Sequence, residues 1–141
     1  MFKQIAKKKA QNFRMNCLAR AKKLGIERDQ VPMPNDFYLF LLTYEDSLIN
    51  YRNRLYLTCE YTGERVALKD IELDHKDPVS RGGSFKIWNL CVTSAKINQQ
   101  KGNMNSMEFA RLQDLLNDFD DDAKKDVLAR LRAGSSRFIK H

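Results

Sequence analysis

An aspartate and a histidine stand side by side at Asp74 and His75, and an asparagine follows at Asn98. Hydrolysis of a phosphodiester at neutral pH needs a base that activates water and a cation on the phosphoryl oxygens. A histidine of ordinary pKa is mostly neutral at pH 7, so His75 is the candidate base. Asp74 and Asn98 offer hard oxygen ligands, which favour one Mg²⁺ or Mn²⁺ ion over a soft metal. These residues therefore predict metal-assisted phosphodiester hydrolysis.

Three nearby side chains have predicted supporting roles. Asn89 is the candidate for taking the proton of the other ring nitrogen of His75, which would fix the tautomer. Arg81 and Lys101 are candidates for holding phosphate oxygens, because a positive clamp stabilises an anionic transition state. A salt bridge within the loop is an alternative for Arg81, and a solvated helix-end cation is an alternative for Lys101. Trp88 is predicted to anchor the loop in the core, with stacking on a base as its alternative.

The elements that must position these residues follow from the local pattern. Residues 71–75 alternate apolar and polar side chains, which predicts a strand that ends at His75. At the end of a strand we expect the turn to aim Asp74 and His75 into one cleft. After it we predict a loop over 78–84, a short apolar strand at 90–92 and a helix over 94–101 that Gly102 ends. The predicted order is strand, loop, strand, helix.

Further helices and strands flank this unit. Before it we predict a helix from Phe2 to Leu24 ended by Gly25, a core helix capped by Asn35 or Asp36 that runs to Leu48, and strands near 55–59 and 66–68. After it we predict a helix capped by Asn105 or Ser106 that carries Phe119, a last helix from Asp120 that ends before Gly134, and a frayed tail over 135–141.

Composition favours a single domain. The chain has 141 residues, of which 43% are hydrophobic, and this suffices for one modest core. It contains no apolar run of about 20 residues and no signal-peptide pattern, so we expect a soluble, cytoplasmic protein without membrane contact. The three cysteines are an odd number without framework spacing, which favours reduced thiols.

Charge is concentrated at one end of the sequence. Residues 1–28 carry a net charge of +8, whereas the remaining 113 residues sum to −1. Such a segment suits a polyanion, because neutralised phosphates release condensed counterions. Nucleic-acid contacts are therefore predicted for four basic residues of this segment, namely Lys7, Lys8, Lys9 and Arg14. A solvated helix face is the alternative, and the same two interpretations, partner surface or solvated face, apply to the acidic stretch 114–126.

The spacing of these residues resembles the HNH endonuclease motif, in the form with asparagine in the third place. The likeness consists of Asp74-His75, then Asn89-Leu90, then Asn98 followed by Lys101-Gly102. It extends over 71–84 and 107–109, includes 59–64, and is similar to small phage and bacterial HNH proteins. It covers about a third of the chain, with a vaguer likeness at 19–26.

This resemblance implies a ββα-metal finger, in which two strands and a helix hold one divalent ion. By the family pattern His75 is the general base, Asp74 and Asn98 bind the metal, and Asn89 positions His75 and the loop. Members cut or nick DNA and typically leave a 5′-phosphate and a 3′-hydroxyl. Histidine is common in the third place, so Asn98 implies an altered metal preference rather than lost activity.

The resemblance also bears on zinc. Many relatives carry two Cys-x-x-Cys pairs that bind a structural zinc, whereas this chain has only Cys59 and Cys91 at the matching places. Two thiolates make a poor tetrahedral site. We therefore expect no structural zinc, and interpret Cys59 and Cys91 as buried small hydrophobes.

The sequence thus predicts an α+β fold, a ββα-metal (HNH) core embedded in N- and C-terminal helices. We expect one compact domain in three parts: a basic helical segment with the core helix over 1–53, the finger over 54–105, and helices over 106–141. The predicted function is metal-dependent cleavage of double-stranded DNA, by nicking or by double-strand cleavage. The alternatives are a catalytically silent nucleic-acid-binding module and an accessory subunit in phage DNA packaging or mobility.

Overall fold

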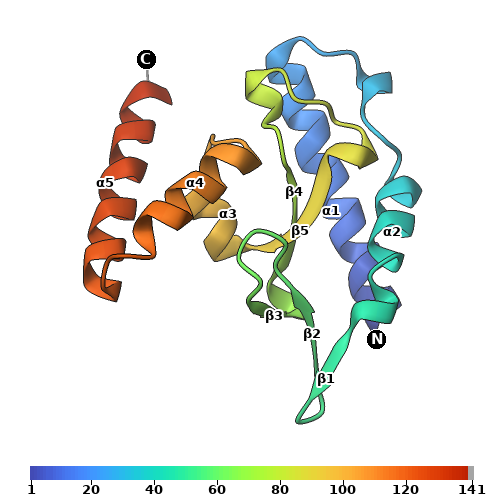
Figure 1. Ribbon diagram of the computed structural model, residues 1–141. Helices are drawn as coiled ribbons and strands as arrows, with labels where there is room; N and C mark the ends of the chain where they lie inside the picture. Colours follow the sequence, from blue (N-terminus) through green and yellow to red (C-terminus); the bar gives the residue numbers. More distant parts are fainter. Residues whose placement is uncertain (140–141) are drawn as a thin grey trace.

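The computed structural model describes residues 1–139 and combines helices with two small antiparallel sheets (Figure 1). This confirms the predicted α+β class. The helices are α1 (Phe2–Leu24), α2 (Pro34–Leu42), α3 (Ala95–Lys101), α4 (Ser106–Leu116) and α5 (Asp121–Ile139). The strands are β1 (Ile49–Tyr51), β2 (Arg54–Thr58), β3 (Arg65–Ala67), β4 (Ile71–His75) and β5 (Leu90–Ser94). Strands β1, β2 and β3 form one sheet in that order, and β4 pairs with β5 in the other.

The central unit has the predicted order of strand, loop, strand and helix. Strands β4 and β5 pair antiparallel, with Ile71 opposite Ser94 and His75 opposite Leu90. Ser94 then caps α3, because its hydroxyl accepts a hydrogen bond from the Ile97 amide at 3.1 Å. Gly102 ends the helix with a positive φ of 54°. The strands and α3 therefore form a ββα unit, in which α3 follows β5 directly in the sequence.

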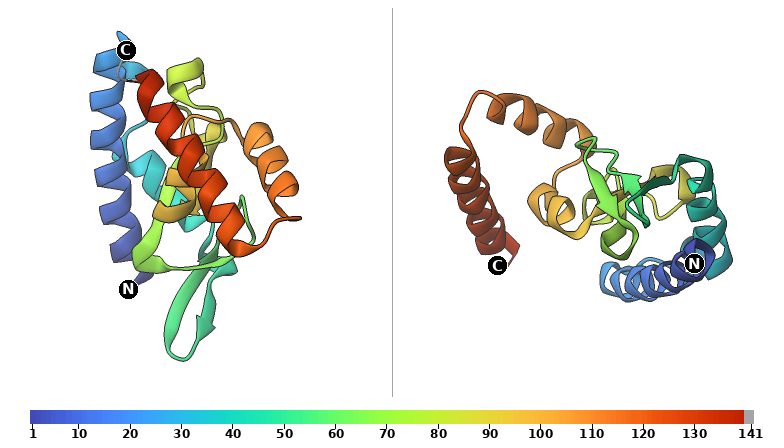
Figure 2. Two further views of the ribbon diagram at one scale, coloured as in Figure 1. Left: turned by 90° about the vertical axis from the view of Figure 1, so that its left-hand side faces the viewer. Right: turned by 90° about the horizontal axis from the view of Figure 1, so that it is seen from below.

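Helix α1 covers one face of this unit. It lies along one side of the β4–β5 ribbon, whereas α3, α4 and α5 lie on the other side (Figures 1 and 2). Its buried positions Ala6, Ala10 and Ala21 are small, which allows close packing against α2. Gly25 ends α1 in the left-handed conformation, as predicted. Phe37 of α2 is fully buried in the core formed there.

Helix α2 differs from the prediction at both ends. It begins at Pro34 after Met33, and the carboxylate of Asp36 accepts a hydrogen bond from the Met33 amide at 2.9 Å from inside the first turn. It ends at Leu42 rather than Leu48, because the chain turns there to enter β1. The apolar side chains beyond residue 42 pack against the core from outside the helix.

Strand β1 was missed by the sequence analysis. It forms a tight hairpin with β2, in which Tyr51 pairs with Arg54. The two intervening residues, Arg52 and Asn53, have positive φ angles of 51° and 64°. Two consecutive residues of this conformation give a turn whose twist matches the flanking strands. Asn53 is the local signal, because asparagine tolerates this conformation better than most residues.

The C-terminal helices have different ends from those predicted. Asn105 caps α4 with Glu108 as expected, but the helix ends at Leu116, before Phe119. Helix α5 continues through Gly134 to Ile139, so both the predicted stop and the predicted frayed tail are wrong as far as residue 139. A glycine inside a helix costs about 1 kcal/mol, which is too little to stop a long helix. The rest of the predicted tail, including His141, lies outside the described residues.

The remaining features of the fold concern the cysteines and the hydropathy of the helices. Cys17, Cys59 and Cys91 are free and buried, which confirms the interpretation of the last two as small hydrophobic side chains. Burial raises the pKa of the Cys17 and Cys91 thiols to about 12. Among the described helices, none is both long and apolar enough to cross a membrane.

The loop between β4 and β5 makes one stability prediction. A Cβ atom added to Gly83 would lie 1.9 Å from the Asp77 carbonyl oxygen, whereas one added to Gly82 would meet open space at a φ of 89°. Gly83→Ala should therefore lower the free energy of unfolding by roughly 3 kcal/mol, and Gly82→Ala by about 1 kcal/mol. Urea unfolding of both variants checks this. Equal losses would contradict the close backbone approach at Gly83.

Candidate active site

A cavity of about 1070 Å³ lies between α1 on one side and α3 on the other, with β4 between them. Asp74, His75 and Asn98 all line it. The right-hand view of Figure 2 shows α1 and α5 on opposite sides of this region, and Leu131 of α5 also lines the cavity. The structure therefore brings the predicted base and the two predicted metal ligands to one cavity.

Asp74 and His75 reach this cavity from opposite faces of β4. Both residues are paired within the strand, opposite Cys91 and Leu90, so their side chains alternate. The expectation that both side chains reach one cleft is confirmed, but a turn is not the cause, because both residues still belong to the paired strand. They share a cavity because β4 belongs to a two-stranded sheet. Its outer edge has no strand partner in the described part of the chain, and all five β4 residues line the cavity.

His75 is held in apolar surroundings. Its side chain is 2% exposed, and its ring centroid lies 5.3 Å from that of Phe13 in α1 and 5.6 Å from that of Phe85 in the loop. Nε2 is buried and has no hydrogen-bond partner within the described residues. Burial lowers the pKa of His75 to about 4, although the nearby Asp74 carboxylate acts in the opposite direction. The imidazole is therefore neutral at pH 7.

Asp74 is engaged on one oxygen. Its Oδ2 accepts a hydrogen bond from the Tyr61 hydroxyl at 2.7 Å and lies 3.1 Å from Lys101 Nζ. Both contacts fall on Oδ2, and no hydrogen bond from the described residues falls on Oδ1. Burial raises the pKa of the Tyr61 hydroxyl, and the Asp74 charge adds to this effect. Tyr61 therefore stays a hydrogen-bond donor to Asp74.

Lys101 is an internal cation. Its side chain is 1% exposed, and besides Asp74 it donates to the His75 carbonyl oxygen at 3.1 Å. The ammonium also lies 5.4 Å from the centroid of the Tyr61 ring. Sequence analysis placed Lys101 on phosphate or in solvent, and the structure instead places it between α3 and β4. Its charge is balanced by Asp74, as a buried ammonium requires.

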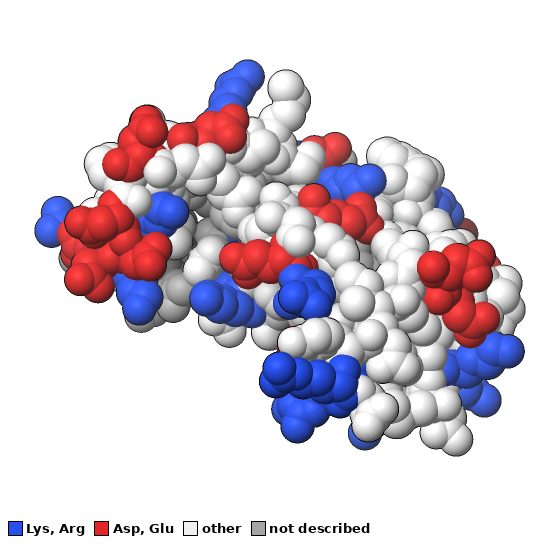
Figure 3. Space-filling model, turned by 60° about the horizontal axis from the view of Figure 1, so that its bottom comes forward, with Lys and Arg blue, Asp and Glu red and all other residues white. Residues whose placement is uncertain are grey.

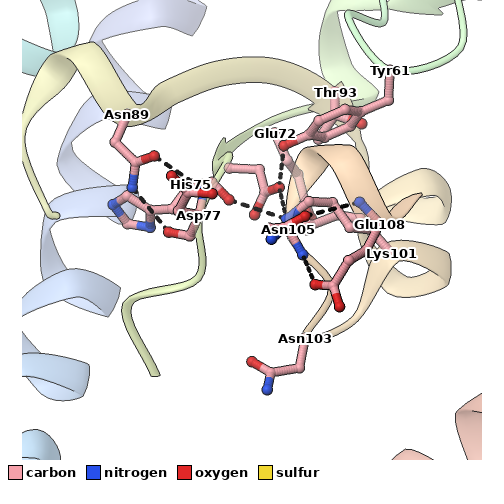
Figure 4. A network of polar contacts seen from close by, with 12 residues as sticks. Tyr61, Glu72, His75, Asp77, Asn89, Thr93, Lys101, Asn103, Asn105 and Glu108 are labelled. Atoms are coloured by element: carbon pink, nitrogen blue, oxygen red, sulfur yellow. Dashed lines mark hydrogen bonds and ion pairs between the residues drawn. The ribbon is translucent and has the colours of Figure 1, made fainter. Parts of the chain in front are cut away.

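Asn98 lies one turn before Lys101 in α3. Its Nδ2 donates to Oε2 of Glu72 at 3.1 Å. Glu72 is two residues before Asp74 in β4, so the two carboxylates project from the same face of the strand. In Figure 4, Glu72 lies beside Tyr61 and Lys101, and His75 lies on the other side near Asn89. The alternation predicted over residues 71–75 implies this shared face, but the sequence analysis gave Glu72 no role.

Asn89 holds the loop rather than the imidazole ring. Its Oδ1 accepts from the Asp77 amide at 3.0 Å, and its Nδ2 donates to the carbonyl oxygens of Asp77 and Ser84 at 2.9 and 2.7 Å. No hydrogen bond among the described residues joins it to the ring of His75. The predicted direct contact is therefore wrong, and the Asn89 side chain instead holds the backbone at Asp77 and Ser84 (Figure 4).

The loop side chains differ in part from the sequence analysis. Arg81 forms an ion pair with Glu108 and donates to the Asn103 carbonyl oxygen at 3.1 Å. Arg81 therefore forms a salt bridge, which was the alternative given for it, rather than lying free for a phosphate. Trp88 is 71% exposed, so the prediction that it anchors the core is wrong.

The basic residues of α1 differ in whether they line the cavity. Arg14 donates to the Pro32 carbonyl oxygen at 3.1 Å, and Lys7 and Lys8 are exposed away from the cavity lining. Lys9 lines the cavity but donates to the Lys69 carbonyl oxygen at 2.8 Å. The sequence analysis missed two exposed cations that line the cavity, Arg20 and Lys23. Their signal was the helical spacing of 9, 12, 16, 20 and 23, which places these residues on one helix face.

The donor set suits a small, hard cation. Asp74 offers an unbonded carboxylate oxygen and Asn98 an amide oxygen, which are the ligand types that Mg²⁺ and Mn²⁺ prefer. The described residues contain no group of three or more His, Cys, Asp or Glu placed to hold a metal. A cation here would therefore depend on the amide of Asn98 and on oxygens from water or substrate, as is usual for Mg²⁺.

Burial of His75 predicts a pH-dependent stability. Its pKa is about 4 in the folded protein and about 6.5 in the unfolded chain, so the folded state binds the proton less well. The resulting stability is complete above pH 6.5 and is lost as the pH falls towards 4. In EDTA, lowering the pH from 7 to 5 should cost the wild type roughly 2 kcal/mol more than His75→Leu. Parallel urea-unfolding profiles for the two proteins would disprove this.

One comparison with known proteins found a family that matches the segment around this cavity. No match was found among curated proteins or among solved structures. A family model described as HNH endonuclease matches residues 59–107, a segment that contains Asp74, His75, Asn89 and Asn98. Such a domain indicates nuclease activity on nucleic acid. This match confirms the resemblance found in the sequence, and residues 59–107 are similar to HNH endonucleases.

Proposed function

We propose that this protein is a metal-dependent endonuclease that hydrolyses phosphodiester bonds of double-stranded DNA, with His75 as the general base. The observation that carries the proposal is that Asp74, His75 and Asn98 line one cavity inside the segment that matches HNH endonucleases. The three residues supply a carboxylate, an imidazole and an amide oxygen, which is the set that this hydrolysis needs.

Asp74 and Asn98 are the residues that would hold the divalent cation, Mg²⁺ or Mn²⁺. When bound, such an ion neutralises charge that develops on the phosphoryl and leaving oxygens. Lys101 and Tyr61 hold Oδ2 of Asp74, so Oδ1 is the oxygen left to face the ion. The residues of the chain thus fix the ligand before substrate arrives, which limits the reorganisation needed during the reaction.

His75 would accept the proton of the attacking water. The water oxygen forms a bond to phosphorus while the bond from phosphorus to O3′ breaks. The products are a 5′-phosphate and a 3′-alkoxide, and the alkoxide takes up a proton to become a hydroxyl. Nε2 is the nitrogen for this role, because it is unpartnered among the described residues and the ring is neutral at pH 7.

One observation favours the second candidate, a nucleic-acid-binding module without catalysis. His75 is 2% exposed between Phe13 and Phe85, so water and phosphate reach it only if these rings give way. Under this alternative His75 is a core side chain, and the cavity binds nucleic acid without cutting it. The cleavage experiment below separates the two candidates.

Cleavage of supercoiled plasmid tests the proposal. Wild-type protein should nick or linearise DNA with Mg²⁺ or Mn²⁺ and not with EDTA, and His75→Ala and Asp74→Asn should lower the rate at least 100-fold, the scale expected for a general base. Asp74→Asn is preferable to Asp74→Ala, because alanine would leave the ammonium of Lys101 buried without a partner. Circular dichroism shows whether the variants fold. Undiminished cleavage by folded His75→Ala would exclude His75 as the base, and gel shifts without cleavage would favour the binding module.

We further propose that the cavity-lining face of α1 contacts the DNA backbone. Arg20 and Lys23 are exposed on this face, and the charge of Arg20 is close enough to His75 to act on its pKa. Figure 3 shows Lys and Arg side chains gathered along the lower edge of this view, whereas acidic side chains lie at the left, in the centre and at the right. A phosphate beside the site would therefore meet positive charge on its α1 side.

Salt-dependent DNA binding tests this surface. In the His75→Ala background with EDTA, the pair Arg20→Gln and Lys23→Gln should weaken binding of a DNA duplex and reduce the slope of log K against log salt by about 2. The pair Lys7→Gln and Lys8→Gln removes the same charge outside the cavity and should change the slope less. An equal effect of both pairs would point to diffuse attraction by the whole helix.

A further inference from the structure

The amide of Asn98 can serve a cation with one end only. Its oxygen is an acceptor and a potential ligand, whereas its NH₂ group is a donor that repels a cation. The two ends have nearly the same shape, so packing alone does not choose between them. A site that relies on this residue therefore needs a partner that distinguishes the two ends.

Glu72 is such a partner. Its Oε2 accepts the hydrogen bond from Asn98 Nδ2 at 3.1 Å. An ionised carboxylate is an acceptor without a donor, so the reversed amide would set two oxygens against each other. The NH₂ end of Asn98 must therefore face Glu72, and Oδ1 is turned away from it.

We propose that Glu72 is a positioning residue that fixes the amide of Asn98 with its oxygen available to the cation. This inference rests on the proposed metal site. Glu72 and Asp74 project from the same face of β4, and Asn98 and both carboxylate residues line the same cavity. The strand therefore fixes one ligand, Asp74, and the orientation of the other, Asn98, at a separation of two residues.

A double-mutant cycle in Mn²⁺ affinity separates orientation from charge. Calorimetric titration of the 141-residue chain with Mn²⁺, without DNA, gives the affinity directly. Glu72→Leu should weaken Mn²⁺ binding about ten-fold, the effect expected for loss of a partner that orients a ligand. In an Asn98→Asp background the same substitution should not weaken binding, because a carboxylate presents an oxygen at either end and needs no orientation.

The alternatives give different results in this cycle. If Glu72 is a direct ligand or acts through its charge, Glu72→Leu weakens binding in both backgrounds, and the inference is wrong. It is equally wrong if Glu72→Leu leaves the affinity of the Asn98 protein unchanged. Should Glu72→Leu fail to fold, Glu72→Gln carries the same cycle, with an expected loss of about two-fold because glutamine accepts either orientation of the amide.

Asp74→Asn provides the control for the metal site itself. If it binds Mn²⁺ as tightly as the wild type, or if the wild type does not bind, the proposed cation site fails and the role of Glu72 fails with it. If binding depends on Asp74 but not on Glu72, the proposed function stands and only this inference is overturned. Thermal unfolding in EDTA shows whether each variant keeps its fold.

Discussion

The site depends on the fact that β4 is paired along one edge alone within the described chain. A strand with partners on both sides would send Asp74 and His75 to two faces separated by a sheet. Because β4 and β5 form a two-stranded ribbon, a cavity can run along the outer edge of β4 and receive side chains from both faces. Helix α1 covers the His75 face and α3 lies on the Asp74 face, so the two helices become the walls of that cavity.

The ammonium of Lys101 connects these parts. Placing it in the interior is unfavourable unless its hydrogen bonds and charge are satisfied. Asp74, the His75 carbonyl oxygen and the Tyr61 ring meet this need. The contact joins the end of α3 to the end of β4, and Asn98 lies one turn earlier on the same helix face. Satisfying one buried charge thereby also places a proposed metal ligand opposite Glu72.

Much of this arrangement follows from the sequence, and the misses have physical causes. Alternation predicted β4, and Gly102 predicted the end of α3, because these signals are local. The burial of Lys101 and the exposure of Trp88 depend on which neighbours surround them in space, and spacing along the chain carries no such information.

The same distinction applies to roles within the motif. The resemblance singled out Asn89, and the structure shows that its amide forms hydrogen bonds with the backbone of Asp77 and Ser84. An asparagine at this position of the motif predicts that its side chain forms hydrogen bonds. The conformation of the loop decides which groups it bonds to. The resemblance gave Glu72 and Arg20 no role, and the folded chain shows that both line the cavity.

The apolar surroundings of His75 have two opposed effects on a general base. They keep the imidazole neutral at pH 7, which a base requires, but a pKa of about 4 also makes it a weak proton acceptor. The cause is desolvation, and desolvation is relieved when water and phosphate enter beside the ring. An anionic phosphate near Nε2 would add to the effect of Asp74 and raise the pKa further towards neutrality. The basicity of His75 in the proposed reaction therefore depends on the substrate that occupies the cavity.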